Sequence, residues 1–408
     1  MASITSIGTY LPTQGQPAAR TAGIDEDAVT LAVAAGVAAL RGVAPADVAH
    51  VVFVSREFPL LEGGNGAALL AGLGVSAHTR ISEIIGGAPA TLDALVSAAT
   101  GTLVVGADIA GAAGASAAFC AAVGADLTLT DRINRSMPVT TRDSDGRSSD
   151  YADPRLARVR GLTQSLGQID GSGPFAAVAG LGGRDAAALS AGTVHQPPAL
   201  PTTGASAPLF AIAALADQHH VGAIAAVEQA TVSVASLGAG EVTVRRDERA
   251  ARPGHKGTFT PGSDLPIVLA AYDRAFDAKL RLQAARCTTC ATLSYPHRYR
   301  CLGCGSESPT DSVALPREAE IYTLATIRVP VPGLVSPYTL TLVELGNTGV
   351  RVLVKLTSAE PGSVQIGHRG RLVFRLVATR SGVPDYGYGF LPDEAGAEPV
   401  RADEKGVA

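Results

Sequence analysis

Four closely spaced cysteines constrain the fold of this chain more than any other feature. Cys287, Cys290, Cys301 and Cys304 form two CxxC pairs that are separated by ten residues. Each pair can present two thiolates from a tight turn toward one tetrahedral centre, and four thiolates in that geometry select zinc, or less often iron. Because four protein ligands leave no open position for substrate or water, we expect one structural metal ion.

Other interpretations of the cysteines fit the spacing less well. In a reducing compartment such a cluster is more typical of a metal site than of a disulfide framework, and four buried free thiols are the remaining alternative. A thioredoxin-like redox site needs one CxxC pair, whereas two paired knuckles make a ribbon. Gly303 and Gly305 relax the backbone of the second knuckle. The fifth cysteine, Cys120, lies in a strand-like run of Ala and Val, where we expect a packed core thiol.

Length and composition indicate a globular protein of two or three domains. The chain has 408 residues, of which 46% are hydrophobic and 17% are charged. Its 33 Lys and Arg against 37 Asp and Glu give a formal net charge of −4 with no basic run, so a nucleic-acid partner is not expected. The N-terminus lacks the pattern of a secretory signal, and no apolar stretch is long enough for a bilayer, which predicts a cytoplasmic protein without a membrane partner.

The sequence pattern changes near residue 245. Before it, strand-like runs such as Val51–Ser55 and Thr102–Gly106 alternate with helix-like runs such as Asp27–Leu40 and Ala90–Ala99. This alternation predicts an α/β layered domain. The segment that follows, VRRDERAARPGHKGTFTPGSD, is charged and rich in Gly and Pro, which indicates a linker or a surface excursion.

Beyond the linker we expect a helix over Leu265–Arg286, then the cysteine cluster, then a small antiparallel barrel. The barrel is predicted from short alternating segments that Gly, Pro and Asn punctuate. These segments are Ile321–Val329, Tyr338–Leu345, Arg351–Leu356 and Arg371–Ala378. The predicted domains are 1–245 (α/β), 246–264 (linker), 265–312 (helix and ribbon), 313–395 (barrel) and 396–408 (flexible tail).

A helix, a four-cysteine ribbon and a small barrel in that order resemble the acyl-CoA-associated zinc-ribbon/OB-fold family of the DUF35 type. The resemblance covers about Leu265–Pro392 and rests on LRLQAARCTTCATLSYPHRYRCLGCGS, AEIYTLATIRVP, PYTLTLVEL and IGHRGRLVF. It implies a zinc ribbon, an OB-fold barrel, and a non-catalytic partner of thiolase-superfamily enzymes that transfer acyl groups or cleave acyl-CoA by thiolysis or retro-aldol reaction. An OB barrel can also bind nucleic acid through stacking aromatics and a basic groove, but these strands carry few aromatics and mixed charge.

The N-terminal region resembles the 3-hydroxy-3-methylglutaryl-CoA synthase branch of the thiolase superfamily. The matching stretches include ITSIGTYLP, IDEDAVTLAVAAGVAAL, HVVFVSREFP, ISEIIGGAPATLDAL, TLVVGADI and GAAGASAAFCAAVG, with SDYADPRLARVRG and TTGASAPLFAIAALADQ further on. About residues 1–245 are covered, which is short for two complete thiolase halves. The resemblance therefore implies a shortened α/β thiolase-like layered domain.

This resemblance points to a nucleophile position that the chain does not fill. Thioester chemistry in the superfamily uses a Cys at a helix start, where the dipole and a nearby His lower the thiol pKa. Aligning the helix pattern back from Ala94 and Leu95 places Ala88 at that position, and alanine has no nucleophilic atom. Glu57, in VSREFP, matches the family's glutamate general acid/base and is a weak catalytic candidate, because no acyl-enzyme exists for it to serve.

The remaining candidates favour structural roles. The family's second-half Phe-His segment is not found; His195, His219 and His220 are available, but the last two follow an apolar helix and are typical of helix ends. The glycine-rich stretches at Gly86-Gly87 and Gly111–Gly114 lack the phosphate-binding patterns, so close packing explains them better.

The sequence predicts a non-catalytic accessory subunit that assembles with a thiolase-superfamily catalytic subunit. It would help to form the acyl-CoA site and stabilise the active partner, with one zinc as its metal and acyl-CoA as a ligand. The alternative is a self-sufficient acyl-CoA aldolase or acyltransferase that uses Glu57 or an unassigned His without covalent catalysis. A third interpretation is nucleic-acid or general scaffold binding through the barrel.

Overall fold

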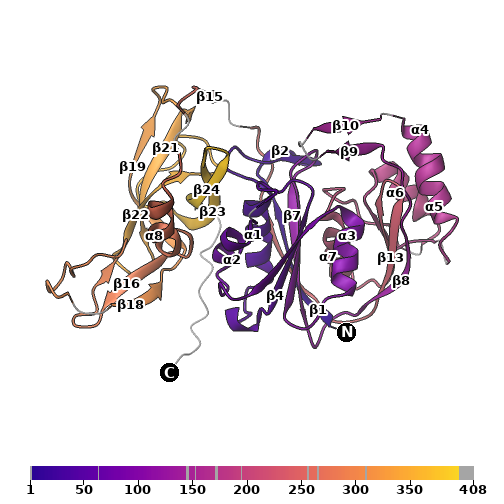
Figure 1. Ribbon diagram of the computed structural model, residues 1–408, viewed down its shortest axis with the longest axis horizontal. Helices are drawn as coiled ribbons and strands as arrows, with labels where there is room; N and C mark the ends of the chain where they lie inside the picture. The colour runs from indigo at the N-terminus through magenta and orange to yellow at the C-terminus, as the bar shows by residue number, and fades with distance from the viewer. Residues whose placement is uncertain are drawn as a thin grey trace. The chain divides into compact units, whose positions relative to one another are not determined.

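The chain divides into two compact units (Figure 1). Unit 1 comprises Met1–His255 with Gly382–Tyr386, and unit 2 comprises Lys256–Ser381 with Gly387–Ala408. The structure, a computed structural model, describes residues 2–62, 64–143, 147–151, 153–170, 173–193, 195–254, 257–263, 266–307 and 310–394. Among these residues, no helix is long and apolar enough to cross a membrane.

A mixed six-stranded sheet forms the first layer of strands in unit 1, in the order β14-β1-β7-β6-β4-β5. β4 runs parallel to β5 and β6, β7 runs antiparallel to β6 and β1, and β14 runs parallel to β1. The strands are β1 (Ser3–Leu11), β4 (His50–Ser55), β5 (Arg80–Ile85), β6 (Thr102–Asp108), β7 (Gly114–Ala121) and β14 (Thr243–Glu248). β6 and most of β4 are buried throughout, which their nearly continuous apolar sequences require.

A four-stranded sheet forms the second layer of strands, in the order β11-β12-β13-β8. β12 pairs in parallel with β11 and antiparallel with β13, which in turn pairs antiparallel with β8. The strands are β8 (Leu127–Ile133), β11 (Ala177–Ala179), β12 (Gly222–Glu228) and β13 (Thr231–Leu237).

Two buried helices, α3 (Ala88–Val96) and α7 (Ala207–Asp217), lie between the sheets (Figure 1). One hydrophobic core joins both helices to both sheets, and many of its side chains are Ala. Small side chains allow the backbones of neighbouring layers to approach closely. The two sheets and the helices between them therefore form a three-layer sandwich.

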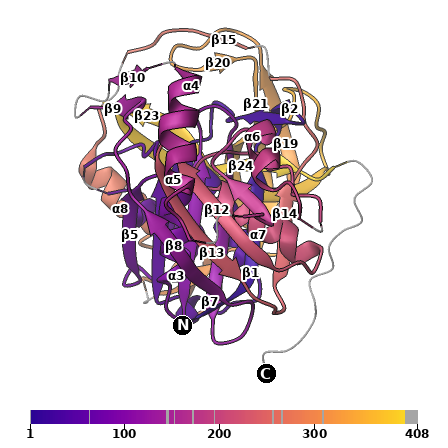
Figure 2. The ribbon, with the colours of Figure 1, turned by 90° about the vertical axis from the view of Figure 1, so that its right-hand side faces the viewer.

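Helices also cover the outer faces of the sandwich. α1 (Ala28–Ala39) packs on the six-stranded sheet and contacts α2 (Gly66–Leu73). An added Cβ at Gly8 of β1 would lie 2.2 Å from the carbonyl oxygen of Ala35, so α1 lies directly on the strand backbone. Figure 2 shows α4 and α5 in front of β8, β12 and β13, where a second core cluster covers the four-stranded sheet. The elements on this side are α4 (Pro154–Leu156), the π-helix η2 (Ala157–Thr163), α5 (Gln164–Leu166) and α6 (Gly183–Leu189).

Short elements complete unit 1. They are the hairpins β2 (Gln14–Gln16) with β3 (Ala19–Thr21) and β9 (Thr140–Arg142) with β10 (Ser148–Asp150), and the 3-10 helix η1 (Pro45–Asp47).

Strand β14 extends into the segment predicted as a linker, so residues 246–248 belong to a sheet. Arg246 of this edge strand forms ion pairs with Asp217 at 2.6 Å and Glu248 at 2.9 Å. Charged side chains protect an exposed sheet edge from pairing with other chains. Because charged residues are also typical of linkers, the sequence predicted a linker where the structure has an edge strand.

A closed five-stranded barrel with the strand order β19-β21-β22-β24-β23 belongs to unit 2, except for residues 383–386 of β24, which group with unit 1. In β21 buried and partly exposed residues alternate strictly, as the sequence pattern predicted. The barrel strands are β19 (Glu318–Ile327), β21 (Tyr338–Leu345), β22 (Arg351–Leu356), β23 (Arg369–Arg380) and β24 (Val383–Pro392). A two-stranded pair, β15 (Thr258–Phe259) and β20 (Val335–Ser336), lies beside them in the same unit.

The predicted helix before the cysteines is shorter than expected. α8 spans Leu269–Leu280, and the chain then enters strand β16 (Gln283–Cys287). Leu282, between them, has a φ of +50°, which α-helical geometry does not allow. Apolar residues beyond Leu280 continued the helical spacing by chance, because they belong to a strand.

Candidate functional site

The four cysteines lie on a small three-stranded sheet in unit 2, with the order β17-β16-β18. Its outer strands are β17 (Leu293–Ser294) and β18 (Thr310–Ala314). Cys287 ends β16, and the other three cysteines lie in the loops that follow. The ribbon, as we call residues 283–314, is therefore a sheet that carries one cysteine at a strand end and three in its loops.

The two CxxC pairs form knuckles with the same backbone hydrogen bonds. In the first, the N–H of Ala291 donates to Cys287 O at 2.8 Å, and in the second the N–H of Gly305 donates to Cys301 O at 3.0 Å. Ala291 and Gly305 both have positive φ, of 61° and 71°. This confirms that Gly305 relaxes the second knuckle, whereas the first uses a non-glycine residue for the same turn.

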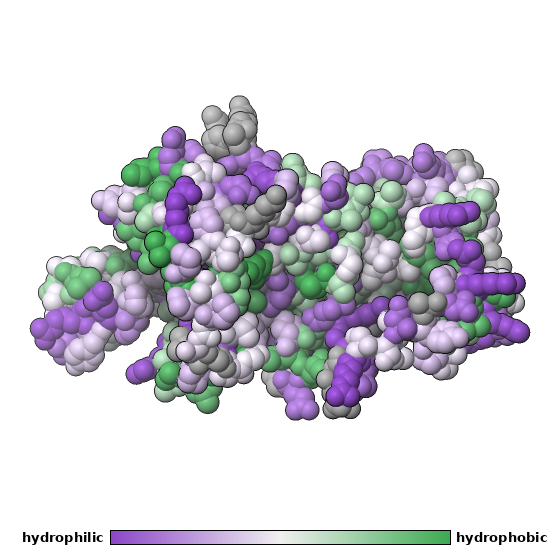
Figure 3. Space-filling model, turned by 90° about the horizontal axis from the view of Figure 1, so that it is seen from above, coloured by the Kyte–Doolittle hydropathy of each residue, from purple (hydrophilic) through white to green (hydrophobic). Residues whose placement is uncertain are grey.

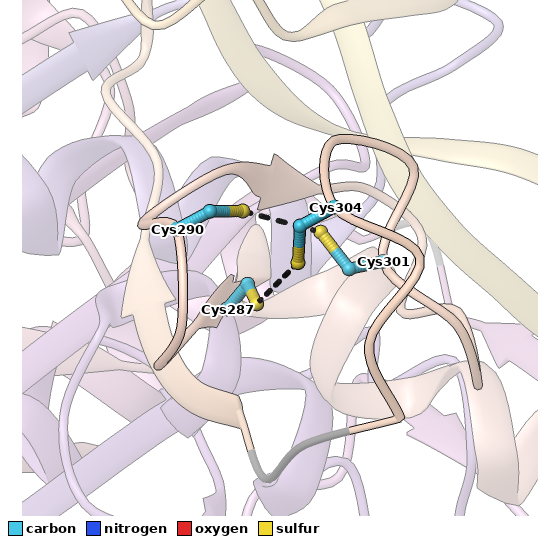
Figure 4. A group of neighbouring side chains, drawn as sticks. All are labelled: Cys287, Cys290, Cys301 and Cys304. Carbon is cyan, nitrogen blue, oxygen red and sulfur yellow. Dashed lines mark hydrogen bonds between the residues drawn. The ribbon is translucent and has the colours of Figure 1, made fainter.

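The knuckles bring all four sulfur atoms within 4.8 Å of one another (Figure 4). The Sγ atoms of Cys290 and Cys301 are 3.5 Å apart, and those of Cys287 and Cys304 are 3.8 Å apart. In a tetrahedron with zinc–sulfur bonds of about 2.3 Å, neighbouring sulfurs are roughly 3.8 Å apart. The four cysteines can therefore hold one metal ion.

The crowded sulfur atoms and their hydrogen bonds shift the pKa values of the thiols. The hydroxyl and backbone of Thr292 lower the pKa of the Cys290 thiol to about 6. At Cys304 a backbone hydrogen bond from Ser306 favours the thiolate, but the neighbouring Cys290 and Cys287 sulfurs outweigh it and raise the pKa to about 12. Four thiolates this close repel one another, and a bound cation removes that repulsion.

The ribbon has almost no hydrophobic core around the knuckles. Within 288–307 and 310–314, no residue is buried. The ribbon lies at the left-hand end of Figure 3, where hydrophilic residues cover much of its surface. A fold element without a core needs another source of stability, which the four-thiolate centre can supply.

Ala88 is the first residue of α3 and follows the glycines that connect β5 to the helix. It is 1% exposed and belongs to the core between the two sheets. The residue that the sequence alignment places at the nucleophile position thus lies at a helix N-terminus. Its methyl group provides no nucleophile there.

An ion pair lies at the N-terminus of α3. The backbone N–H of Gly87 donates to Oε2 of Glu228 at 2.9 Å, and Oε1 of Glu228 pairs with the guanidinium of Arg56. Arg56 follows β4, and Glu228 is the last residue of β12, so the pair joins the ends of strands from both sheets. No local pattern in the sequence indicates it.

Glu57 is half-buried next to this pair. Its Oε2 accepts a hydrogen bond from the Ile109 N–H at 3.3 Å. Burial raises the pKa of the Glu57 carboxyl, opposed by that hydrogen bond. The buried carboxylate of Asp108 accepts the backbone N–H groups of Ala205 and Ser206, at 2.7 and 2.9 Å, just before α7. Asp108 is therefore a structural cap for α7, and Glu57 is a half-buried carboxyl whose pKa burial raises.

The remaining sequence candidates lie elsewhere. Cys120 is 1% exposed in β7, and burial raises the pKa of its thiol to about 12, so it is a packed and unreactive core residue. His219 and His220 follow the C-terminus of α7. The ring of His220 stacks on that of His195 with 3.5 Å between the centroids, a contact that the sequence did not suggest.

Sequence comparison identifies the C-terminal part of the chain. A family profile described as "ChsH2, C-terminal OB-fold domain" matches residues 312–375. A "DUF35 domain-containing scaffold protein" of Methanothermobacter thermautotrophicus is 27% identical over 123 residues, which cover 29% of this chain and 92% of the relative. These matches confirm the predicted DUF35-type module and its OB-fold barrel.

Similar solved structures cover both parts of the chain. The "Ltp2-ChsH2(DUF35) aldolase" is 26% identical, with 30% of this chain and 90% of that chain covered and a TM-score of 0.25. A single-residue variant of Xanthomonas campestris OleA is 13% identical, with coverage of 58% and 98% and a TM-score of 0.48. The HMG synthase of the curacin biosynthetic pathway is 13% identical, with coverage of 59% and 80% and a TM-score of 0.44.

Proposed function

We propose that this protein is a non-catalytic accessory subunit of an acyl-CoA-processing complex, in which a thiolase-superfamily partner performs the chemistry. One observation carries the proposal: α3 begins with Ala88, which has no nucleophile, in a region that resembles thioester-processing enzymes. The name of the Methanothermobacter relative, a scaffold protein, supports the same role for the DUF35-type module.

In this proposal, Cys287, Cys290, Cys301 and Cys304 bind one zinc ion that fixes the ribbon. The ion would hold the two knuckles together, and it takes no part in the reaction because its four protein ligands complete a tetrahedral shell. The ribbon and barrel would then help the partner to form the acyl-CoA site.

Co-expression with a thiolase-like chain tests the proposal. We expect a heteromeric complex that survives gel filtration, buries more than about 2,000 Å² and shows acyl-CoA activity that neither chain has alone. A homo-oligomer of this chain with full activity would contradict the proposal, and so would covalent labelling of Cys120 by acyl-CoA.

A second function is favoured by one specific observation, the raised pKa of Glu57. A half-buried carboxyl with a raised pKa could act as a general acid in an acyl-CoA aldolase or acyltransferase without covalent catalysis. Turnover of acyl-CoA by the purified chain alone, lost in Glu57→Gln, would establish this alternative.

A further inference from the structure

The N-terminus of α3 is occupied by a side chain from a strand far away in the sequence. Gly87 N–H and Arg56 both bind the carboxylate of Glu228, which is 172 residues from Arg56. The first N–H groups of a helix have no partner inside the helix and carry partial positive charge, so they attract anions. Here the anion is part of the protein.

The close approach of Glu228 explains why residue 87 is glycine. An added Cβ at Gly87 would lie 2.9 Å from Oε2 of Glu228 and 3.0 Å from Nη2 of Arg56. The φ of Gly87 is −108°, so a left-handed φ is not the reason for glycine at this position. The carboxylate and the guanidinium fill the space that a side chain would need.

The segment around β9 holds both members of the ion pair in place. Gln229, next to Glu228, accepts the N–H of Val139 at 3.0 Å and donates to Thr140 O at 2.9 Å. Arg142 donates from its guanidinium to the backbone oxygen of Arg56. The pair is therefore fixed from both sides, and its position does not depend on the contact with α3 alone.

We propose that Glu228 closes the N-terminus of α3 to acyl thioesters. A thioester oxygen that gains negative charge needs backbone N–H donors or cations, and a helix N-terminus provides them. In this chain the carboxylate of Glu228 already accepts the Gly87 N–H and neutralises the charge of Arg56, so neither group is available to an incoming oxygen. The inference rests on the proposed function. A closed α3 N-terminus, like the absence of a nucleophile at Ala88, would prevent unit 1 from catalysing thioester chemistry, which its partner would then perform.

The geometry also allows a small anion to replace Glu228. The side chains of Arg56 and Glu228 are 41% and 23% exposed, so water reaches the pair. In Glu228→Ala the Gly87 N–H and the Arg56 guanidinium lose their common partner and form a site for a carboxylate from solution. Acetate is therefore a suitable probe.

The experiment follows the Gly87 amide by NMR in the metal-loaded full chain. Labelling glycine with both carbonyl ¹³C and ¹⁵N selects Gly-Gly pairs, which occur only at 63–64, 86–87 and 182–183. Gly63→Ala and Gly183→Ala identify the other two signals. Potassium acetate is then titrated against potassium chloride at constant ionic strength.

We expect acetate to shift the Gly87 signal saturably in Glu228→Ala and to leave it in place in the parent chain. Glu241→Ala, which removes an exposed glutamate elsewhere, is the matched control and should behave as the parent does. Acetate should also raise the melting temperature of Glu228→Ala above that in chloride, with no such rise in the parent.

Two results would overturn the proposal: acetate or N,S-diacetylcysteamine, an uncharged thioester probe, shifts Gly87 in the parent chain, or acetate leaves Gly87 unchanged in Glu228→Ala. These outcomes are independent of the proposed function, which fails when the chain alone turns over acyl-CoA. A complex with the expected activity and a parent Gly87 that responds to acetate would refute the role of Glu228 only.

Discussion

Loss of the metal from the four-cysteine centre is expected to unfold the ribbon and to leave the barrel folded. The perturbation is Cys301→Ser, or chelation of the metal in the parent chain. Ordering a residue costs about 1–2 kcal/mol of backbone entropy, and burial of apolar surface normally offsets that cost. The described part of the knuckle region, 288–307 and 310–314, has no buried residue to provide this offset.

The metal is the one large stabilising contribution available to the knuckles. Structural zinc binds small peptides with roughly 10–16 kcal/mol, which matches or exceeds the stability of a whole domain at about 5–15 kcal/mol. Backbone hydrogen bonds such as Gly305 N–H to Cys301 O add only about 1 kcal/mol each. Removal of the metal should therefore melt the ribbon completely, because no other contribution to the stability of the knuckles is of comparable size.

Hydrogen exchange measured by mass spectrometry, together with elemental analysis, tests this reasoning. The parent should contain one zinc per chain, and chelation should remove protection from peptides of 287–307 while β21 in the barrel stays protected. Cys120→Ala, which removes a cysteine outside the centre, should keep its zinc. Well under one equivalent of zinc or iron in the parent, or an unchanged melting curve for Cys301→Ser, would refute the argument.

Three further predictions concern unit 1. Cys120 should resist iodoacetamide at neutral pH, because burial raises its thiol pKa to about 12, and Cys120→Ala should keep the activity of the assembled complex within about threefold; rapid alkylation of the folded chain would contradict this. Burial raises the pKa of Glu57, so the folded state binds this proton more tightly and stability falls as the pH rises from the ordinary value of 4.5 through the raised value. Glu57→Gln should therefore stabilise unit 1 more at pH 7 than at pH 4 in urea unfolding, and an equal effect at both values would disprove it. Gly8→Ala should lower the free energy of unfolding by about 3 kcal/mol or more, because its Cβ would meet the backbone of α1 at 2.2 Å. Gly183→Ala, where an added Cβ has nothing within 4 Å, should leave the stability nearly unchanged. Similar melting temperatures for the two variants would refute this prediction.

Local patterns predicted the cysteine knuckles and most strands of the barrel in unit 2. The four cysteines lie within 18 residues, and each knuckle is closed by hydrogen bonds between near neighbours in the chain. Strand β21 of the barrel alternates with a period of two, as a strand with one buried face must. β24 is buried continuously from Pro384 to Leu391, shows no such alternation and was not predicted. The errors occurred where local pattern and tertiary contact disagree: the end of α8, and strand β14, whose charged residues are typical of both an edge strand and a linker.

The charged groups of unit 1 could not be predicted in the same way. Glu228 meets Arg56 across 172 residues, and Asp108 caps α7 across 98 residues from Ser206. Neither contact is indicated by a local pattern, although Asp108 lies in the TLVVGADI stretch, because each partner is far away in the sequence. The family resemblance placed a helix start at Ala88, where α3 begins, but it gave no indication that a carboxylate from β12 binds there.

Gly86 and Gly87 show how far a sequence can go toward such a contact. Their lack of a phosphate-binding pattern predicted close packing, and both positions are closely packed: an added Cβ at Gly86 would lie 2.6 Å from Cβ of Ala90, and one at Gly87 would touch Glu228 and Arg56. A glycine therefore indicates that another group lies close to the backbone at that position, but it does not indicate which group. At Gly86 that group is a methyl, with no bearing on function, whereas at Gly87 it is a charged pair on the donors that thioester chemistry would need. The two glycines are adjacent, and nothing in the sequence distinguishes them. Only the groups that lie near them in the folded chain show that Gly86 packs against a methyl group and that Gly87 contacts the Arg56–Glu228 pair.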